Sequence, residues 1–127
     1  MARVVIATSK SAFEQNGFTI PEAWDAEFIS YKYTDEEMIA AAKDAEIIVV
    51  GSGHVVSRHV IESCPSLKLI QTEGVGFEKV DVEAAKEKGV WVCNNKGANA
   101  VSVAEHAIGL MLAGLRRTSL TDRKSVV

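Results

Sequence analysis

Hydrophobic positions in this chain come in short runs that alternate with polar, helix-forming stretches. The runs are rich in Val, Ile and Leu and apolar on consecutive positions, which is typical of strands covered on both faces. Residues 18–27 lack a clear period and indicate an irregular stretch or a short helix. The predicted strands are residues 3–7, 28–31, 46–50, 67–71 and 90–93.

Several predicted helices carry recognisable end signals. Thr34 and Glu37 have the spacing of a capping box, in which each side chain bonds the other's backbone N–H. Asp81 is placed to cap a helix that Gly89 ends. The first of the predicted helices begins after Thr34 and ends at residue 45, and the second begins after Ser57 and ends at residue 64. Two more span residues 81–89 and 100–117, and residues 118–127 are expected to be a frayed tail.

Strands that alternate with helices on short connections predict an α/β fold with a doubly wound parallel sheet. Five strands favour the flavodoxin-like order 2-1-3-4-5. Ligands of such sheets bind beyond the carboxyl ends of the strands, near the point where the strand order reverses. The loops expected there are residues 8–10, 51–54 and 74–76, with the turn 94–99 beside them.

Composition narrows the function classes. The 127 residues have a net charge of −3 and scattered basic side chains, which gives no reason to expect nucleic acid. We expect a cytoplasmic chain without a membrane anchor, because no signal peptide is visible and the apolar run 107–115 is too short to span a bilayer. His54 and His59 are poorly spaced for a shared metal, and Cys64 and Cys93 are predicted to be buried thiols.

Two glycine loops are the candidate ligand sites. Gly51, Ser52 and Gly53 follow a predicted strand, but Val56 replaces the third glycine of a dinucleotide fingerprint, so a turn at a cleft edge is favoured over a phosphate site. The loop of Gly74, Val75 and Gly76 has two interpretations: backbone amides turned towards an anion, or a tight turn that needs positive φ.

The last predicted helix begins after Asn99, which is either its N-cap or a side-chain donor to a substrate oxygen. Residues 100–117 are apolar nearly all the way round, so this helix must be buried on more than one side. A second domain or a second copy of the chain is therefore expected to cover it. Burial of about four such side chains would stabilise an assembly by roughly 6–12 kcal/mol before entropy costs.

Together, these residues resemble a known family. The resemblance is to the D-isomer-specific 2-hydroxyacid dehydrogenases. It begins with the segment from Leu67 through Gly74, Val75, Gly76 and Phe77 and continues in later positions. The later positions are Val80, Asp81, Ala84, Ala85, Gly89, Val90, Asn94, Gly97, Ala98, Asn99, Ala100, Val103, Ala104, Glu105 and Arg117. Lys96 in place of proline, and Glu78 and Lys79 in place of Asp-Asn, depart from the family pattern.

The resemblance implies a two-domain NAD-dependent oxidoreductase that interconverts 2-hydroxy and 2-oxo acids. Residues 1–99 would be a substrate domain, residues 100–117 an interdomain or dimerisation helix, and 118–127 a tail. Substrate contacts are expected from the site residues Ser52, Gly53, Gly74, Val75, Gly76 and Asn99. Val103 and Glu105 would make weaker contacts to NAD.

The family's Rossmann glycine motif and its catalytic arginine, glutamate and histidine match positions beyond residue 127. We therefore expect no catalytic residue in this chain, no tight NAD binding by it alone, and a product truncated before the NAD-binding domain. Its partner would be that missing domain, or another copy bound through residues 100–117. The alternative is a free-standing module for binding a small acid or for dimerisation.

Overall fold

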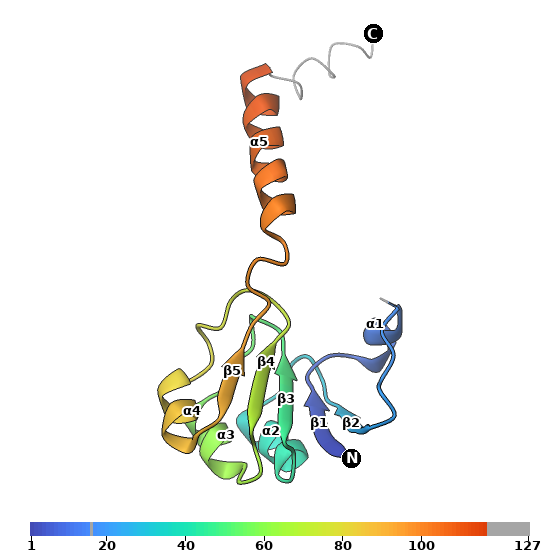
Figure 1. Ribbon diagram of the computed structural model, residues 1–127, viewed down its shortest axis with the longest axis vertical. Helices are drawn as coiled ribbons and strands as arrows, with labels where there is room; N and C mark the ends of the chain where they lie inside the picture. Colours follow the sequence, from blue (N-terminus) through green and yellow to red (C-terminus); the bar gives the residue numbers. More distant parts are fainter. Residues whose placement is uncertain (16, 117–127) are drawn as a thin grey trace. The chain divides into compact units, whose positions relative to one another are not determined.

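A computed structural model describes residues 1–15 and 17–116 of the chain, in two units. The first unit, residues 1–95, is built on a five-stranded sheet in which all neighbouring strands are parallel (Figure 1). The strand order is β2-β1-β3-β4-β5, which confirms the predicted order. The strands are β1 (Ala2–Ile6), β2 (Trp24–Phe28), β3 (Ile47–Val50), β4 (Leu69–Thr72) and β5 (Trp91–Cys93).

Four helices connect these strands, and three of them follow N-cap side chains. The Thr34 hydroxyl and the Glu37 carboxylate form both bonds of the capping box, and the Asp81 carboxylate accepts from the Ala84 N–H at 2.8 Å. Gly89 ends its helix with φ of 71°, a conformation that favours glycine. The helices are α1 (Lys10–Gln15), α2 (Asp35–Ala42), α3 (Arg58–Ser63) and α4 (Val82–Lys88).

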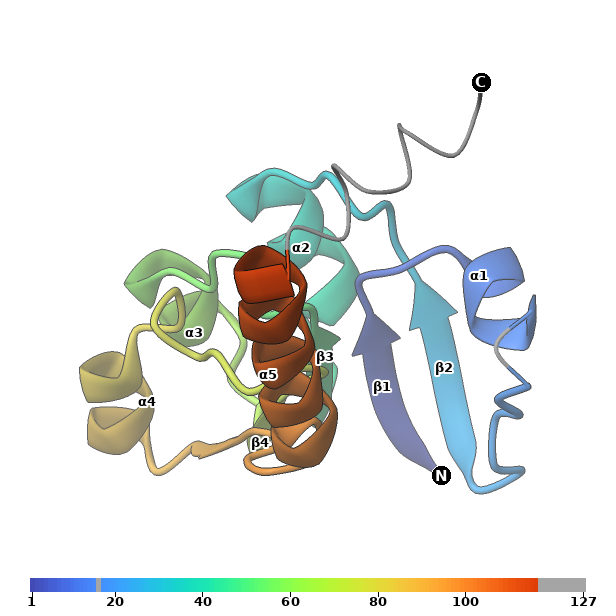
Figure 2. The same cartoon turned by 90° about the horizontal axis from the view of Figure 1, so that it is seen from above.

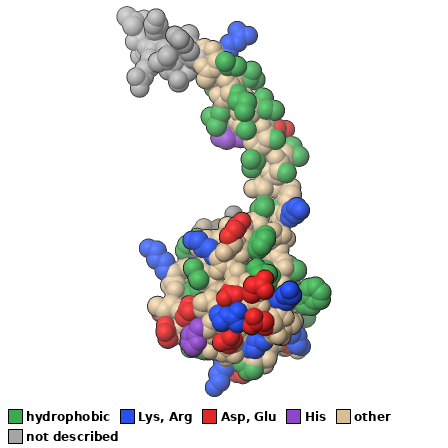
Figure 3. Space-filling view, turned by 90° about the vertical axis from the view of Figure 1, so that its left-hand side faces the viewer, with side chains coloured by type: hydrophobic (Ala, Val, Ile, Leu, Met, Phe, Trp, Pro, Cys, Tyr) green, Lys and Arg blue, Asp and Glu red, His purple; other side chains and the backbone are tan. Residues whose placement is uncertain are grey.

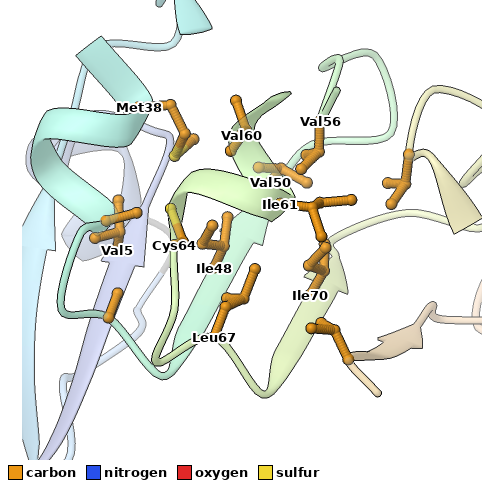
Figure 4. Close-up of a cluster of buried hydrophobic side chains, with 14 of the residues drawn as sticks. Val5, Met38, Ile48, Val50, Val56, Val60, Ile61, Cys64, Leu67 and Ile70 are labelled. Carbon is orange, nitrogen blue, oxygen red and sulfur yellow. The ribbon is translucent and has the colours of Figure 1, made fainter. Parts of the chain in front are cut away.

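The main core lies between the sheet and α2, α3 and α4. Side chains from alternate strand positions, such as Val5, Ile48 and Ile70, are fully buried against the helices (Figure 4). Met38 of α2 and Ile61 of α3 fill the space between the elements and are also fully buried. This continuous apolar layer fixes the ends of β3 and β4, from which the two glycine loops emerge.

The opposite side of the sheet, called the second face below, is covered unequally. Figure 2 shows α1 beside β2, where the rings of Phe13 and Phe28 lie 5.6 Å apart. A groove of about 390 Å³ separates α1 from Val49 and Gln71 of the central strands. Trp91 of β5 is 76% exposed. Helices therefore lie on both faces of the sheet, as predicted. Among the described residues of the first unit, α1 is the only helix on the second face.

Three local predictions were wrong. The second strand is Trp24–Phe28 rather than residues 28–31, because Asp25 and Glu27 of this edge strand form ion pairs with Arg3 and so conceal its apolar alternation. Residues 10–15 form α1, whereas a loop was predicted to reach residue 10. Cys64 is buried, as predicted, but Cys93 at the end of the edge strand β5 is exposed.

The second unit begins at Lys96 and contains α5 (Ala100–Arg116). None of the side chains of α5 is buried, and its polar positions are few, as the green surface along it in Figure 3 shows. Arg117 and the tail 118–127 lie outside the described residues. In the part of the chain that the structure describes, no helix has the length and hydrophobicity needed to span a membrane. The large exposed side chains of α5 are Val101, Val103, Ile108, Leu110, Met111, Leu112 and Leu115.

Candidate functional site

The loop after β4 is held by hydrogen bonds to its carbonyl groups. The Asn95 side-chain amide donates to the Glu73 carbonyl at 2.8 Å, and the Asn95 backbone N–H donates to the Gly74 carbonyl at 2.9 Å. The Asn94 side-chain amide donates to the Val75 carbonyl at 2.7 Å. Three consecutive carbonyls of this loop therefore face the two asparagines that follow β5.

This arrangement sets the direction of the amides in the same peptide units. In a trans peptide the C=O and N–H groups point in opposite directions, and the described chain contains no cis peptide bond. The N–H groups of Gly74, Val75 and Gly76 therefore point away from Asn94 and Asn95. None of these three N–H groups donates to another described residue. We call them the amide seat, since successive unpaired N–H groups on one side of a loop form an anion-binding concavity.

Ser52, from the loop after β3, borders the amide seat. A Cβ atom added to Gly74 would lie 3.0 Å from the Ser52 Oγ, and one added to Gly76 would lie 3.3 Å from the Ser52 Cβ. Neither glycine has the positive φ that one of the two sequence interpretations required. Glycine is present here because Ser52 approaches the backbone closely, and the structure thereby brings Ser52 together with residues 74–76.

Two side chains of opposite charge flank the amide seat. A Cβ atom on Gly76 would lie only 2.9 Å from the Glu78 Oε2, so this carboxylate rests against the loop. The Lys79 Nζ donates to the carbonyl of Gly53, the residue after Ser52, at 3.0 Å. An anion in the seat would thus meet a nearby negative charge, which opposes its binding, and a nearby cation, which favours it.

The loop of Gly51, Ser52 and Gly53 does not form a dinucleotide site. A Cβ on Gly51 would lie 3.3 Å from the His54 Nδ1, so the imidazole occupies the space above this glycine. The Ser57 hydroxyl accepts from the Val60 N–H at 3.3 Å, so α3 begins with its own cap. A pyrophosphate needs an open glycine turn at a helix N-terminus, so the glycine-lined turn is the better description and the described residues of this loop do not fit NAD.

The other predicted site residues belong to the second unit. The Asn99 carbonyl accepts from the Val103 N–H at 2.9 Å, which places Asn99 at the N-cap position of α5. Its side-chain amide forms no hydrogen bond with a described residue. Val103 and Glu105 are two positions apart and point in directions roughly 200° apart around the helix, so both cannot face one side of a cofactor. Their roles, like that of Asn99, stay predictions.

Other kinds of site find little support. No group of three or more His, Cys, Asp or Glu side chains could hold a metal ion within residues 1–15 and 17–116. Burial raises the pKa of the Cys64 thiol, which makes it a poor nucleophile. On the face of the first unit seen in Figure 3, acidic and basic side chains are interleaved. Many charges of the described residues are paired, as Arg58 is with both Glu62 and Glu87.

The contacts of Asn94 and Asn95 were not predicted from the sequence. Both residues were assigned to a turn beside the site, and Asn94 also to the family pattern, whereas in the structure they orient the amide seat through its carbonyls. The available signal was topological. The ends of β4 and β5 are adjacent, since Gln71 pairs with Cys93. The two residues that follow Cys93 must therefore lie against the loop after β4.

Comparisons with known proteins identify the family of the chain. The model of the family "D-isomer specific 2-hydroxyacid dehydrogenase, catalytic domain" matches residues 3–124. The D-3-phosphoglycerate dehydrogenase of Methanocaldococcus jannaschii is 51% identical over 83 residues, which are 65% of this chain and 16% of the relative. The hydroxypyruvate reductase of Thermotoga maritima is 40% identical over 92 residues, 72% of this chain and 30% of the relative.

Solved structures extend the similarity to nearly the whole chain. The NAD-dependent formate dehydrogenase from Staphylococcus aureus, solved in complex with NAD, superposes with a TM-score of 0.76 at 29% identity. That match covers 99% of this chain and 40% of the formate dehydrogenase chain. The chain thus spans well under half of the relatives that it matches. Through its fold, its loop positions and its match over residues 3–124, the chain belongs to the D-isomer specific 2-hydroxyacid dehydrogenase family, as part of the catalytic domain.

Proposed function

We propose that this chain is the substrate-binding domain of a D-2-hydroxyacid dehydrogenase and that its amide seat binds the carboxylate of a small 2-oxo or 2-hydroxy acid. The observation that carries the proposal is the common direction of three unpaired N–H groups, at Gly74, Val75 and Gly76. Hydrogen bonds to a charged acceptor contribute about 1.5–3 kcal/mol each. Two such bonds would hold a carboxylate and leave the neighbouring 2-oxo carbon facing outward.

Ser52 and Gly53 are proposed to line one side of the bound acid. Ser52 approaches both glycines of the loop, and its hydroxyl can donate to a substrate oxygen or accept from a substrate hydroxyl. Lys79 adds a positive charge beside Gly53, which favours an acid over a neutral analogue. Asn99 belongs to the second unit, and its role as a donor to a substrate oxygen stays a prediction.

Hydride transfer requires a nicotinamide and an acid–base group held against the substrate. The described residues of the loop 51–53 do not fit a dinucleotide. We therefore propose that an NAD-binding domain supplies the redox chemistry, and the similar formate dehydrogenase, which was solved in complex with NAD, supports this proposal. The present chain alone would bind the acid without turning it over.

Titration of the 127-residue chain with pyruvate, followed by amide NMR and calorimetry, tests the seat. The Gly74, Val75 and Gly76 amide resonances should shift on binding, whereas pyruvamide, which lacks the carboxylate, should leave them unchanged. Val75→Pro removes one N–H donor and should weaken binding about tenfold, while Val75→Ala keeps the donor and should bind like the wild type. Equal loss in both variants would show that the amide is not a ligand.

Activity is tested separately. NADH mixed with the chain and pyruvate, glyoxylate or hydroxypyruvate should remain at the rate of the blank. Turnover well above the blank would refute the proposed division of labour, because the cofactor site would then have to lie within this chain. Addition of a separately expressed NAD-binding domain from a relative would be expected to restore turnover if the two parts assemble.

A second role is favoured by α5. Its seven large apolar side chains are each more than half exposed, and full burial of one such side chain stabilises an assembly by about 1.5–3 kcal/mol. We propose that α5 associates with a second copy of the chain or with an NAD-binding domain. Analytical ultracentrifugation should show an oligomer that Leu112→Lys dissociates, whereas a surface change on another element, Glu62→Lys, should not. A monomeric wild type would count against this role.

A further inference from the structure

His54 is the one side chain in the described part of the chain with a buried polar atom that has no hydrogen-bond partner. The residue is 9% exposed, and its Nε2 is the unpaired atom. The Gly51 N–H donates to the His54 Nδ1 at 2.9 Å, so Nδ1 carries a lone pair and the ring proton is on Nε2. A neutral imidazole with a buried, unpaired N–H calls for a functional explanation, since most buried polar groups are paired.

The imidazole closes the loop after β3 on itself. The His54 backbone N–H donates to the Gly51 carbonyl at 3.0 Å, so His54 binds both peptide groups of Gly51, one through its backbone and one through its side chain. Tyr31 lies with its ring centroid 4.1 Å from that of His54, and its hydroxyl lies 3.7 Å from where a Gly53 Cβ would be. The tyrosine and the histidine together shape the backbone on both sides of Ser52.

Ser52 at the tip of this loop is the residue that borders the amide seat. The loop is also held by Lys79, which donates to the Gly53 carbonyl, while the Gly51 side depends on His54. We propose that His54 is a positioning residue: its neutral imidazole holds Gly51, and thereby Ser52, against the amide seat, and addition of a proton to Nδ1 releases the loop. The ligand part of this inference rests on the proposed carboxylate function.

The physical reason is the change of Nδ1 from acceptor to donor. A protonated Nδ1 would face the Gly51 N–H, so two donors would oppose each other. The charge would also be buried, and no described carboxylate pairs with the ring. The Tyr31 and Tyr33 rings beside the imidazole offer only a partial cation–π compensation. Binding of an acid should therefore weaken as the pH falls, although a new positive charge would by itself strengthen it.

Few titratable or charged groups surround the imidazole among the described residues. Tyr31 and Tyr33 contact the ring, Asp35 acts on Tyr33, and Lys79 binds the loop. Whether a pH-dependent change of the loop comes from His54 is therefore decided by substitution of His54 itself, with the exposed His59 and His106 as controls.

The first test needs no ligand. In the full chain, the Gly51, Ser52 and Gly53 amide resonances are followed from about pH 8 to about pH 5.5, the range in which imidazole titrates. The Gly51 amide should move and lose its protection from hydrogen exchange as the pH falls. His54→Asn keeps an acceptor oxygen without a titrating ring, so its loop should stay constant, whereas His59→Asn should behave like the wild type. A stationary Gly51 amide in the wild type would overturn the role of His54.

The second test adds pyruvate. The wild type should bind pyruvate about tenfold more weakly at the acid end of the pH range, because loss of one hydrogen bond to a charged ligand has about this effect. His54→Asn should bind with the same affinity at both ends, and His54→Phe, which keeps a ring without an acceptor, should bind weakly at both. If His54→Asn kept the wild-type pH dependence, the proposal would fail. No pyruvate binding at any pH would instead refute the carboxylate function, and the Gly51 measurement distinguishes the two failures.

Discussion

Gly74→Ala is a direct test of how closely the two loops meet. The added Cβ would lie 3.0 Å from the Ser52 Oγ and 3.1 Å from the Ser52 Cβ, and both contacts are shorter than ordinary van der Waals separation. Overpacking of this kind costs about 1–3 kcal/mol, and an exposed Ser52 that can move places the cost near the lower end. Against this, alanine at an ordinary φ gains about 0.4–1 kcal/mol by restricting the unfolded chain.

The structure also predicts how the cost can be removed. Beyond the chain neighbours of Gly74, Ser52 supplies the only atoms within 4 Å of the added Cβ among the described residues. Gly74→Ala should therefore destabilise the wild type by about 1 kcal/mol but stabilise a Ser52→Gly background by about 0.5 kcal/mol, a coupling of about 1.5 kcal/mol.

Urea unfolding of the four proteins of this cycle, followed by circular dichroism, measures the coupling. Gly109→Ala serves as the matched control, because a Cβ at Gly109 meets nothing within 4 Å, and its effect should be the same with and without Ser52→Gly. Additivity of Gly74→Ala and Ser52→Gly to within about 0.3 kcal/mol would refute the close approach on which the amide seat depends.

Three further predictions follow from other groups. Burial and the charge of Asp35 raise the pKa of Tyr33 from 10.0 to about 12, so the folded state keeps this proton to a higher pH than the unfolded state does. The free energy of unfolding should therefore fall between about pH 10 and pH 12, as measured by urea unfolding at a series of pH values. Tyr33→Phe should show a shallower fall. Glu78→Gln removes the negative charge beside Gly76 and should raise the affinity for pyruvate a few-fold in calorimetry at low salt. The control Glu83→Gln on α4 should have no effect. Equal affinities of Glu78→Gln and the wild type would place Glu78 outside the site. Cys93 should react with a thiol reagent in the folded chain and Cys64 only on unfolding, so that Cys93→Ser abolishes the fast phase; a fast phase that survives would contradict the burial of Cys64.

The parts of the fold that the sequence predicted well are those with local signals. The capping box at Thr34, the cap at Asp81 and the terminal Gly89 depend on neighbouring residues, and all three are confirmed. The strand order follows from the alternation of strands and helices. The second strand was misplaced because its polar residues are paired with Arg3 of another strand, a contact more than 20 residues away along the chain that no local pattern reveals.

The candidate site was predictable only in part for the same reason. The glycines at 74 and 76 identified the loop, but the reason for glycine, the approach of Ser52, is a contact between loops. The direction of the amides depends on Asn94 and Asn95. Their side-chain bonds reach carbonyls 19 and 22 residues earlier, so the sheet register must be known to predict them. From the sequence, His54 was considered only as a metal ligand with poor spacing to His59, because burial and an unpaired nitrogen are properties of the folded chain.

The uneven cover of the second face gives the molecule an intrinsic optical signal. The chain contains two tryptophans, and Trp91 on the edge strand β5 is 76% exposed. An indole in water emits at long wavelength and is readily quenched by iodide, and both properties reverse when another surface excludes solvent from the ring. Fluorescence of the unlabelled chain would therefore report in real time whether another domain binds over β5. Trp24→Phe leaves Trp91 as the single emitter.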